Sequence, residues 1–196
     1  MYMQSVIHLY SVYIELSLSL LMLLYKKIDL PRWESIQSEL VRAVKWDKVS
    51  GHNGFIPFEN LTTPLLDCTL RDLNLLIESR WIIAFRGCYT TILHTDYSES
   101  RILKTSLNLP VYNCVQSRTE FYQRSKDHDE VTLRSRGVQY FEHTLVEDLY
   151  LDQFTLDQPT LINTSVPHRV VNQGPETRVA VSIRFAREPL ELWGSI

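Results

Sequence analysis

Cysteine is scarce in this chain and never occurs in a paired arrangement. The three cysteines, Cys68, Cys88 and Cys114, include no Cys-x-x-Cys pair. This spacing excludes a zinc ribbon and provides no disulfide framework. A chain without disulfides fits a reducing compartment, so we expect a cytoplasmic protein.

An excess of charge of either sign is also missing. Twenty Lys and Arg residues stand against 23 Asp and Glu residues, which leaves a net charge of −3. We therefore expect no nucleic-acid partner, because such proteins carry a basic footprint. Hydrophobic and charged contents of 44% and 22% in 196 residues are typical of one globular domain with a sizeable core. None of these features specifies an oligomeric state.

Apolar runs long enough to cross a membrane are absent as well. Val12–Tyr25 is strongly apolar but short, and a spanning helix needs about 20 apolar residues. No Lys or Arg precedes Lys26, so the basic start of a secretory signal is missing. We divide the chain into an apolar N-terminal extension, 1–25, and a single domain, 26–196. The apolar run is either a buried helix or strand, or part of a segment preceding a start at Met22; a membrane anchor is disfavoured.

Two segments in the first half have the apolar period of a helix. Glu34–Trp46 places its aliphatic residues on one helical face. Thr63–Arg80 does the same, and it opens with an N-cap threonine and a proline at its first position. Lys27–Trp33 is expected to be a short strand, and Lys48–Asn60, with two glycines and a proline, a loop.

Short β-branched and aromatic runs separated by turn residues fill the remainder of the chain. The eight expected strands are Trp81–Phe85, Tyr89–Leu93, Ile102–Tyr112, Thr119–Gln123, Val138–Leu145, Thr160–Asn163, Val166–Asn172 and Arg178–Phe185. The pattern predicts a mainly β, closed or sandwiched architecture braced by the N-terminal helices. Its β core is expected at about 81–186.

The best candidate for chemistry is a His-x-Asp motif at the end of a β-branched run. His94 and Asp96 are two residues apart, so in an extended segment both side chains point the same way. His168, at the head of another predicted strand, is the candidate third ligand. Two imidazoles and one carboxylate leave open positions on a metal, as in non-haem Fe(II) oxygenases. A structural zinc site would instead be closed by four ligands, usually including cysteine.

An arginine follows the second histidine at a useful spacing. If Gln173–Thr177 closes a hairpin, Asn172 pairs with Arg178, and His168 faces Ser182. Arg178 then shares a sheet face with His168, about 13–14 Å away along the backbone at ~3.4 Å per residue. An arginine fork holds a carboxylate through two hydrogen bonds. A five-carbon dicarboxylate that also chelates the metal would span the remaining distance.

The segments HTD and NTSVPHRVVNQGPETRVAVSIRF resemble the Fe(II)/2-oxoglutarate-dependent dioxygenases, which have a double-stranded β-helix (jelly-roll or cupin-like) fold. The resemblance covers about 81–185 and is greatest to the aspartyl/asparaginyl β-hydroxylase-like and prolyl-hydroxylase-like branches. It implies that His94, Asp96 and His168 hold Fe(II), that Arg178 binds the far carboxylate of 2-oxoglutarate, and that O₂ is consumed.

Further candidates follow from the same resemblance. Lys104–Asn113 is similar to the family's strand after the first metal motif, where Lys104, Ser106 and Asn108 alternate and would face the cosubstrate. Ser182 would either hydrogen-bond the cosubstrate or pack beside the second histidine. Asp96 stands where the aspartyl/asparaginyl branch often has glycine. A carboxylate there places the chain nearer the ordinary triad enzymes and argues against a halogenase.

The expected function is hydroxylation of an amino-acid or peptidyl side chain, with a small-molecule or peptide substrate. The alternative is a metal-dependent isomerase, or a non-catalytic binding module, on the same cupin-like fold. A structural interaction protein with an ordinary turn at His94 is a third possibility. A rival His-x-Glu, His128 and Glu130, lies in a charge-dense stretch typical of a solvated loop, and Ser165 lacks the glycines of a hydrolase elbow.

Overall fold

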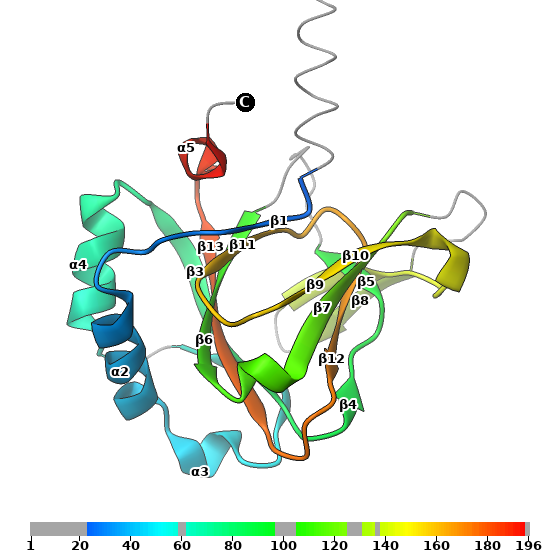
Figure 1. Cartoon of the computed structure of the whole chain (residues 1–196), viewed down its shortest axis with the longest axis horizontal. Coiled ribbons are helices and arrows are strands. Elements are labelled where there is room, and N and C mark those ends of the chain that lie inside the picture. Colours follow the sequence, from blue (N-terminus) through cyan, green and yellow to red (C-terminus); the bar gives the residue numbers. More distant parts are fainter. Residues whose placement is uncertain (1–22, 59–61, 97–104, 125–130, 136–137, 195–196) are drawn as a thin grey trace, which may run out of the picture.

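The computed structural model describes residues 23–58, 62–96, 105–124, 131–135 and 138–194. Within these residues the chain forms 13 strands arranged in two antiparallel sheets. Figure 1 shows the two sheets with helices flanking one of them. The expected mainly β architecture with flanking N-terminal helices is therefore present.

The first sheet, sheet A, has six strands in the order β1-β11-β6-β13-β3-β2. Its strands are β1 (Tyr25–Lys27), β2 (Asn53–Pro57), β3 (Ile77–Phe85), β6 (Thr105–Tyr112), β11 (Thr160–Asn163) and β13 (Arg178–Phe185). Strand β13 is central, since it pairs with β3 along one edge and with β6 along the other.

The second sheet, sheet B, has seven strands. Six follow the order β10-β7-β12-β5-β9-β8, and β4 also pairs with β12. Its strands are β4 (Tyr89–Thr90), β5 (His94–Asp96), β7 (Ser117–Tyr122), β8 (Val131–Ser135), β9 (Val138–Glu142), β10 (Tyr150–Thr155) and β12 (His168–Asn172). The strand that carries the second histidine, β12, therefore lies beside the strand that carries the His-x-Asp motif.

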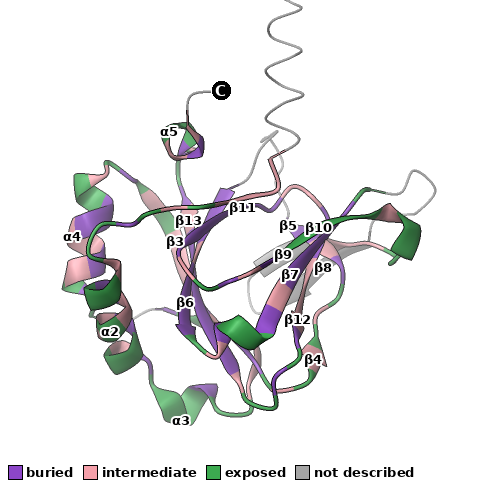
Figure 2. Ribbon diagram, in the orientation of Figure 1, coloured by how far each residue is buried: buried purple, intermediate pink, exposed green. Residues whose placement is uncertain are grey.

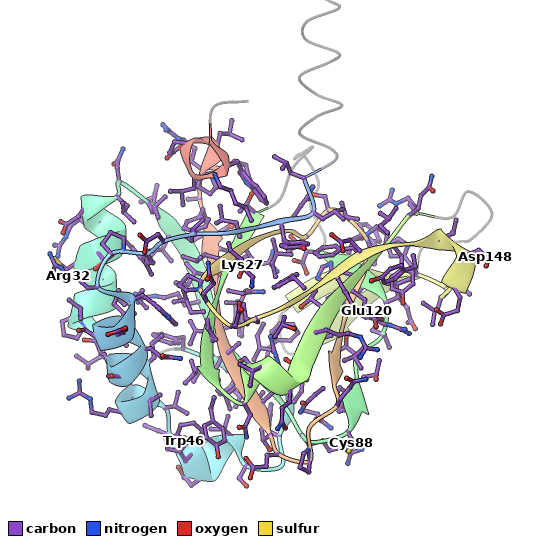
Figure 3. All side chains as sticks on the ribbon, viewed as in Figure 1. Lys27, Arg32, Trp46, Cys88, Glu120 and Asp148 are labelled. Carbon is purple, nitrogen blue, oxygen red and sulfur yellow. The ribbon has the colours of Figure 1, made fainter. Side chains whose placement is uncertain are left out.

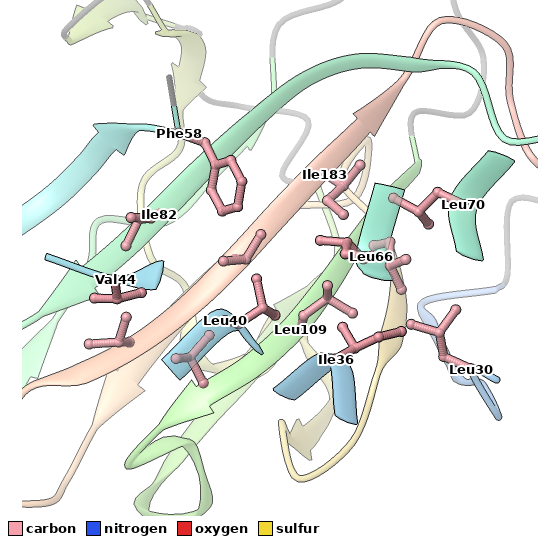
Figure 4. Close-up of a cluster of buried hydrophobic side chains, with 14 of the residues drawn as sticks. Leu30, Ile36, Leu40, Val44, Phe58, Leu66, Leu70, Ile82, Leu109 and Ile183 are labelled. Atoms are coloured by element: carbon pink, nitrogen blue, oxygen red, sulfur yellow. The ribbon is translucent and has the colours of Figure 1, made fainter. Parts of the chain in front are cut away.

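Helices α2 (Trp33–Ala43) and α4 (Pro64–Asp72) cover the outer face of sheet A. Their buried leucine and isoleucine residues pack with those of the sheet in one apolar cluster (Figure 4). Figure 2 shows that both helices are exposed on the side away from the sheet. The shorter elements are α3 (Trp46–Val49), α5 (Leu190–Trp193) and the 3₁₀ turns η1 (Cys114–Gln116) and η2 (Glu147–Leu149).

Strand β13 separates the apolar core from a polar interior. Val179, Val181 and Ile183 are fully buried in the cluster under the helices. Burying such a side chain stabilises the fold by about 1.5–3 kcal/mol. Because side chains alternate along a strand, Arg178 and Ser182 face the opposite way, between the sheets. The alternation anchors the strand on one face and leaves the other face for polar groups.

The predicted helix at Thr63–Arg80 is too long. The helix starts after Thr63 as predicted, but it ends at Asp72, and Asn74 follows with a φ of 54°. The chain then enters β3 at Ile77. The leucines of this stretch fit one helical face, but the positive φ of Asn74 turns the chain out of the helix. Pairing of β3 with β13 and β2 therefore overrides the local helical pattern.

Two predictions in the first 60 residues are also wrong. The strand expected at Lys27–Trp33 lies earlier, at Tyr25–Lys27, where it pairs with β11. The loop expected at Lys48–Asn60 contains β2, which pairs with β3. Glycine and proline are tolerated there because β2 is an edge strand of sheet A.

The predicted hairpin between the strands at 168–172 and 178–185 does not exist. Strand β12 pairs with β4, β5 and β7, whereas β13 pairs with β3 and β6. Neither strand has a free edge for the other, so the turn between them carries the chain from sheet B to sheet A. The register that placed His168 opposite Ser182 within one sheet is therefore incorrect, as is the pairing of Asn172 with Arg178.

The apolar run before Met22 lies outside the described residues. Leu23 and Leu24, which are described, pack against the interior, and Tyr25 opens β1. None of the helices in the described part of the chain is long and apolar enough to cross a membrane.

Candidate metal centre and anion site

The inner faces of the two sheets line a small cavity of about 40 Å³. All six residues predicted for the site line it: His94, Asp96, Asn108, His168, Arg178 and Ser182. The predicted hairpin does not form, but the six residues still line one cavity. They come from the inner faces of two opposed sheets and not from one face of a single hairpin. Phe55, Ile83, Phe85, Ile162 and Val170 form apolar parts of the wall.

The two candidate histidine ligands are neighbours across β12 and β5. His168 is the direct partner of His94, and the ring centroids are 4.5 Å apart. Each ring donates Nδ1–H to the carbonyl two residues before it, over 3.0 Å to Ile92 and 2.9 Å to Val166. Carbonyl oxygens only accept, so Nδ1 is the donor in both rings and Nε2 is the ring nitrogen that remains for a metal. Such a bond is the usual support for a metal-ligating histidine.

His168 is held in the neutral form that a metal ligand needs. Its side chain is almost fully buried. Burial, together with the nearby His94 ring, lowers the pKa of His168 to about 3, and the Asp96 carboxylate only partly opposes this. A neutral imidazole at physiological pH can bind a cation without first losing a proton.

Asp96 is buried and negatively charged. Burial alone would raise the pKa of its carboxyl group, but Arg184, His168 and His94 hold that pKa well below the usual range. Oδ2 of Asp96 forms an ion pair with Nη2 of Arg184, although it makes no hydrogen bond of regular geometry. Arg184 also donates from Nη1 to Oγ1 of Thr164 over 2.9 Å.

No group of three His, Cys, Asp or Glu side chains in the described residues is arranged to hold a metal ion as it stands. Within the candidate trio, the two imidazoles adjoin one another while the carboxylate faces Arg184. A metal bound by His94, Asp96 and His168 would have to share the carboxylate with Arg184 or displace the guanidinium. The donor types and the Nδ1 hydrogen bonds that orient both rings fit a metal of the Fe(II) kind.

Arg178 is a buried cation without a carboxylate partner among the described residues. Its side chain is 2% exposed. Nε donates to Oγ of Ser117 over 2.9 Å, and Ser117 in turn donates to the carbonyl of Cys114 over 2.7 Å. Nη1 is buried with no hydrogen-bond partner, and burial lowers the pKa of Arg178. This guanidinium is therefore oriented and desolvated but not neutralised.

Asn108 and Ser182 are cross-strand partners on the inner face of sheet A. Asn108 accepts a bond of 3.4 Å from Ser106, another residue of the cavity wall. Asn108 and Ser182 offer an amide and a hydroxyl to a molecule inside the cavity.

Three polar residues of the site were not predicted for these roles. Arg184 lies on the same face of β13 as Arg178, and its ion pair with Asp96 was not foreseen. The signal available in the sequence was the alternation of side chains along the strand, which places Arg184 on the same face as Arg178 and Ser182. Ser117 and Thr164, which hold the two arginines, gave no signal because isolated hydroxyl residues are common in strands.

The rival motif at His128 and Glu130 lies outside the described residues. His143 hydrogen-bonds Oγ1 of Thr95 from outside the cavity. Asn172 has a structural role, since its Nδ2 donates to the carbonyls of Phe85, Arg86 and Glu176 and so ties the turn before β13 to the end of β3.

Comparison with known proteins gives structural matches alone, since no protein-family model and no curated sequence matches the chain. The non-haem α-ketoglutarate-dependent carbocyclase SnoK from nogalamycin biosynthesis aligns at a TM-score of 0.50 and 10% identity, over 82% of this chain and 78% of its own. A Pseudomonas putida prolyl-4-hydroxylase aligns at 0.46 and 10%, over 85% and 94%. HygX from Streptomyces hygroscopicus, solved with nickel and 2-oxoglutarate bound, aligns at 0.46 and 11%, over 82% and 81%.

The likeness to SnoK concerns the fold, because 10% identity carries no information on the reaction. Taken with the two antiparallel sheets, it confirms the predicted architecture. The chain has the double-stranded β-helix, or cupin-like, fold.

Proposed function

We propose that the protein is an Fe(II)/2-oxoglutarate-dependent dioxygenase that hydroxylates an amino-acid or peptidyl side chain. The observation that carries the proposal is the buried, unneutralised guanidinium of Arg178 in the same cavity as the two imidazoles and the Asp96 carboxylate. Metal donors and a separate carboxylate receptor within one cavity are what a chelating dicarboxylate requires.

Arg178 supports an anionic ligand for an energetic reason. An uncompensated buried charge costs several kcal/mol, and Ser117 bonds to Nε alone. A carboxylate that meets the unbonded Nη1 would neutralise the charge and satisfy that donor. Two carboxylates at the ends of a five-carbon chain allow 2-oxoglutarate to reach both Arg178 and the metal donors.

In this proposal His94, His168 and Asp96 would hold Fe(II) in the cavity. Bound there, the metal supplies O₂ activation coupled to oxidative decarboxylation of 2-oxoglutarate to succinate and CO₂, with one oxygen atom inserted into a substrate C–H bond. Ser182 and Asn108 orient the cosubstrate by hydrogen bonds. The apolar wall, including Phe55 and Ile162, excludes water from the reacting groups.

A binding module on the same fold is the second candidate. The ion pair of Asp96 with Arg184 favours it, because that carboxylate is already neutralised by a protein group. An isomerase has no use for Arg178 as a dicarboxylate receptor, so we place it third.

The test is succinate formation from 2-oxoglutarate by the Fe(II)-loaded protein in air, with metal binding measured in parallel. His168→Ala should abolish both metal binding and succinate formation, whereas His52→Ala, outside the cavity, should change neither. Arg178→Ala should retain the metal and lose succinate formation at low 2-oxoglutarate. Absence of metal binding by the parent protein would favour the binding module.

A further inference from the structure

The cavity holds more positive than negative charge. Apart from the histidines, the charged side chains among the described residues that line it are the carboxylate of Asp96 and the guanidinium groups of Arg178 and Arg184. The two guanidinium groups therefore face a single carboxylate in the described wall, which leaves one positive charge uncompensated.

Loading the cavity as proposed above does not remove this charge. A divalent cation and the dianion of 2-oxoglutarate cancel one another, so the loaded site keeps the excess positive charge of its wall. Arg178 is then neutralised by the far carboxylate of 2-oxoglutarate. Asp96 serves the metal, and Arg184 has to share or give up its carboxylate partner.

Arg184 lies away from the cosubstrate end of the cavity. It is six residues from Arg178 along the same face of β13, which is about 20 Å at ~3.4 Å per residue. Its side chain is 14% exposed, whereas Arg178 is 2% exposed. Thr164 holds Nη1 of Arg184, so the guanidinium remains positioned beside the metal donors when Asp96 turns to a metal. A cation held there lines the cavity beside the metal donors.

We propose that Arg184 binds an anionic group of the primary substrate, and that this substrate carries a carboxylate. The inference rests on the proposed function and gives it a substrate class: an acidic amino acid, or a peptide with an acidic side chain or free C-terminus near the hydroxylated carbon. In the metal-free chain Asp96 takes the place of that carboxylate. Arg184 is thus a specificity-determining residue. In the metal-free protein it also neutralises the carboxylate of Asp96.

The test uses two probes of the same shape and different charge, butyrate and butyramide. Their dissociation constants are measured by NMR titration with protein loaded with Ni(II) and 2-oxoglutarate, so that no turnover is needed. The parent should bind butyrate at least about tenfold more tightly than butyramide. Arg184→Gln should bring this ratio close to one, and Arg184→Lys should keep part of it. Arg187→Gln, an exposed arginine just beyond β13, is the matched control and should keep the parent's ratio.

The results separate this inference from the proposed function. If the parent binds Ni(II) and 2-oxoglutarate but shows no preference for butyrate, including no detectable binding of either probe, Arg184 does not select a carboxylate. An unchanged preference in Arg184→Gln gives the same conclusion. If the parent fails to bind 2-oxoglutarate, the proposed function fails and this inference with it. Arg184→Lys keeps the test valid should Arg184→Gln fail to fold.

Discussion

His168 lies directly opposite His94 in the pairing of β12 with β5, and their ring centroids are 4.5 Å apart. Both rings use Nδ1 to bond a carbonyl two residues earlier. Two imidazoles at this separation repel one another if both are protonated, and burial adds to that cost. The sheet therefore fixes a pair of histidines that is stable when His168 is neutral.

The metal-free protein should lose stability as the pH falls from 7 to 5. An unfolded histidine has a pKa of about 6.5, whereas that of His168 is lowered to about 3 in the fold. Between these values the unfolded chain binds the extra proton, so the free energy of unfolding decreases by about 1.4 kcal/mol per pH unit, or about 2 kcal/mol at pH 5.

Urea unfolding at the two pH values, with a chelator present, measures this effect. His168→Gln should remove about 2 kcal/mol of the pH dependence, because glutamine does not titrate. His52→Gln should keep the parent's dependence. Identical dependence in the parent and His168→Gln would show that His168 is not held neutral by the fold.

Gly87→Ala should destabilise the protein by about 1–3 kcal/mol, the usual cost of overpacking. A Cβ at Gly87 would lie 1.9 Å from the carbonyl oxygen of Pro175. Both groups are backbone, so the turn between β12 and β13 has to move. Since Arg178 follows that turn, 2-oxoglutarate affinity should fall as well. Thermal unfolding and ligand titration check the two effects, and a variant as stable as the parent would mean that the turns are not in contact.

Glu120→Gln should lower the free energy of unfolding by about 1.5–3 kcal/mol, the range for a lost hydrogen bond to a charged group. Glu120 lies on β7 (Figure 3), and its buried carboxylate accepts bonds from Arg118, Arg169 and Tyr122. Glu147 pairs with the same Arg169 at 3.9 Å but is 73% exposed. Glu147→Gln is therefore the control variant. Denaturant unfolding should show that it lowers the free energy of unfolding by less than about 1 kcal/mol. Equal losses in both variants would contradict the account of this network.

The sequence predicts the fold best where side-chain alternation and burial coincide. The strand Arg178–Phe185 has its predicted bounds, because valine and isoleucine alternate there with polar residues. The start of α4 after Thr63 follows from the threonine and proline. The end of α4 and the existence of β2 depend on pairing with β3, a non-local contact that no local period contains.

The residues predicted for the candidate site line one cavity, but the geometry predicted for them is wrong. His94, Asp96, His168 and Arg178 share the cavity, since motif spacing selects strands whose inner faces meet. The short loop before Arg178 equally fits a hairpin and a crossing between sheets, and local sequence does not decide between them. The ion pair of Asp96 with Arg184 joins β5 to β13 and required the three-dimensional arrangement to be seen.

The central claim is that Arg178 receives the far carboxylate of 2-oxoglutarate beside a metal held by His94, Asp96 and His168. The most direct measurement is anaerobic titration of 2-oxoglutarate into the Fe(II)-loaded parent, Arg178→Ala and Arg178→Lys, with the Fe(II) affinity of each measured first. We expect equal Fe(II) affinity and one equivalent of 2-oxoglutarate bound by the parent. Arg178→Ala should bind 2-oxoglutarate on the order of a hundred- to several-thousand-fold more weakly, equivalent to about 3–5 kcal/mol for an unpaired buried charge. Arg178→Lys should recover part of the loss, because lysine supplies a charge without the fork. Equal 2-oxoglutarate affinity in the parent and Arg178→Ala would contradict the account.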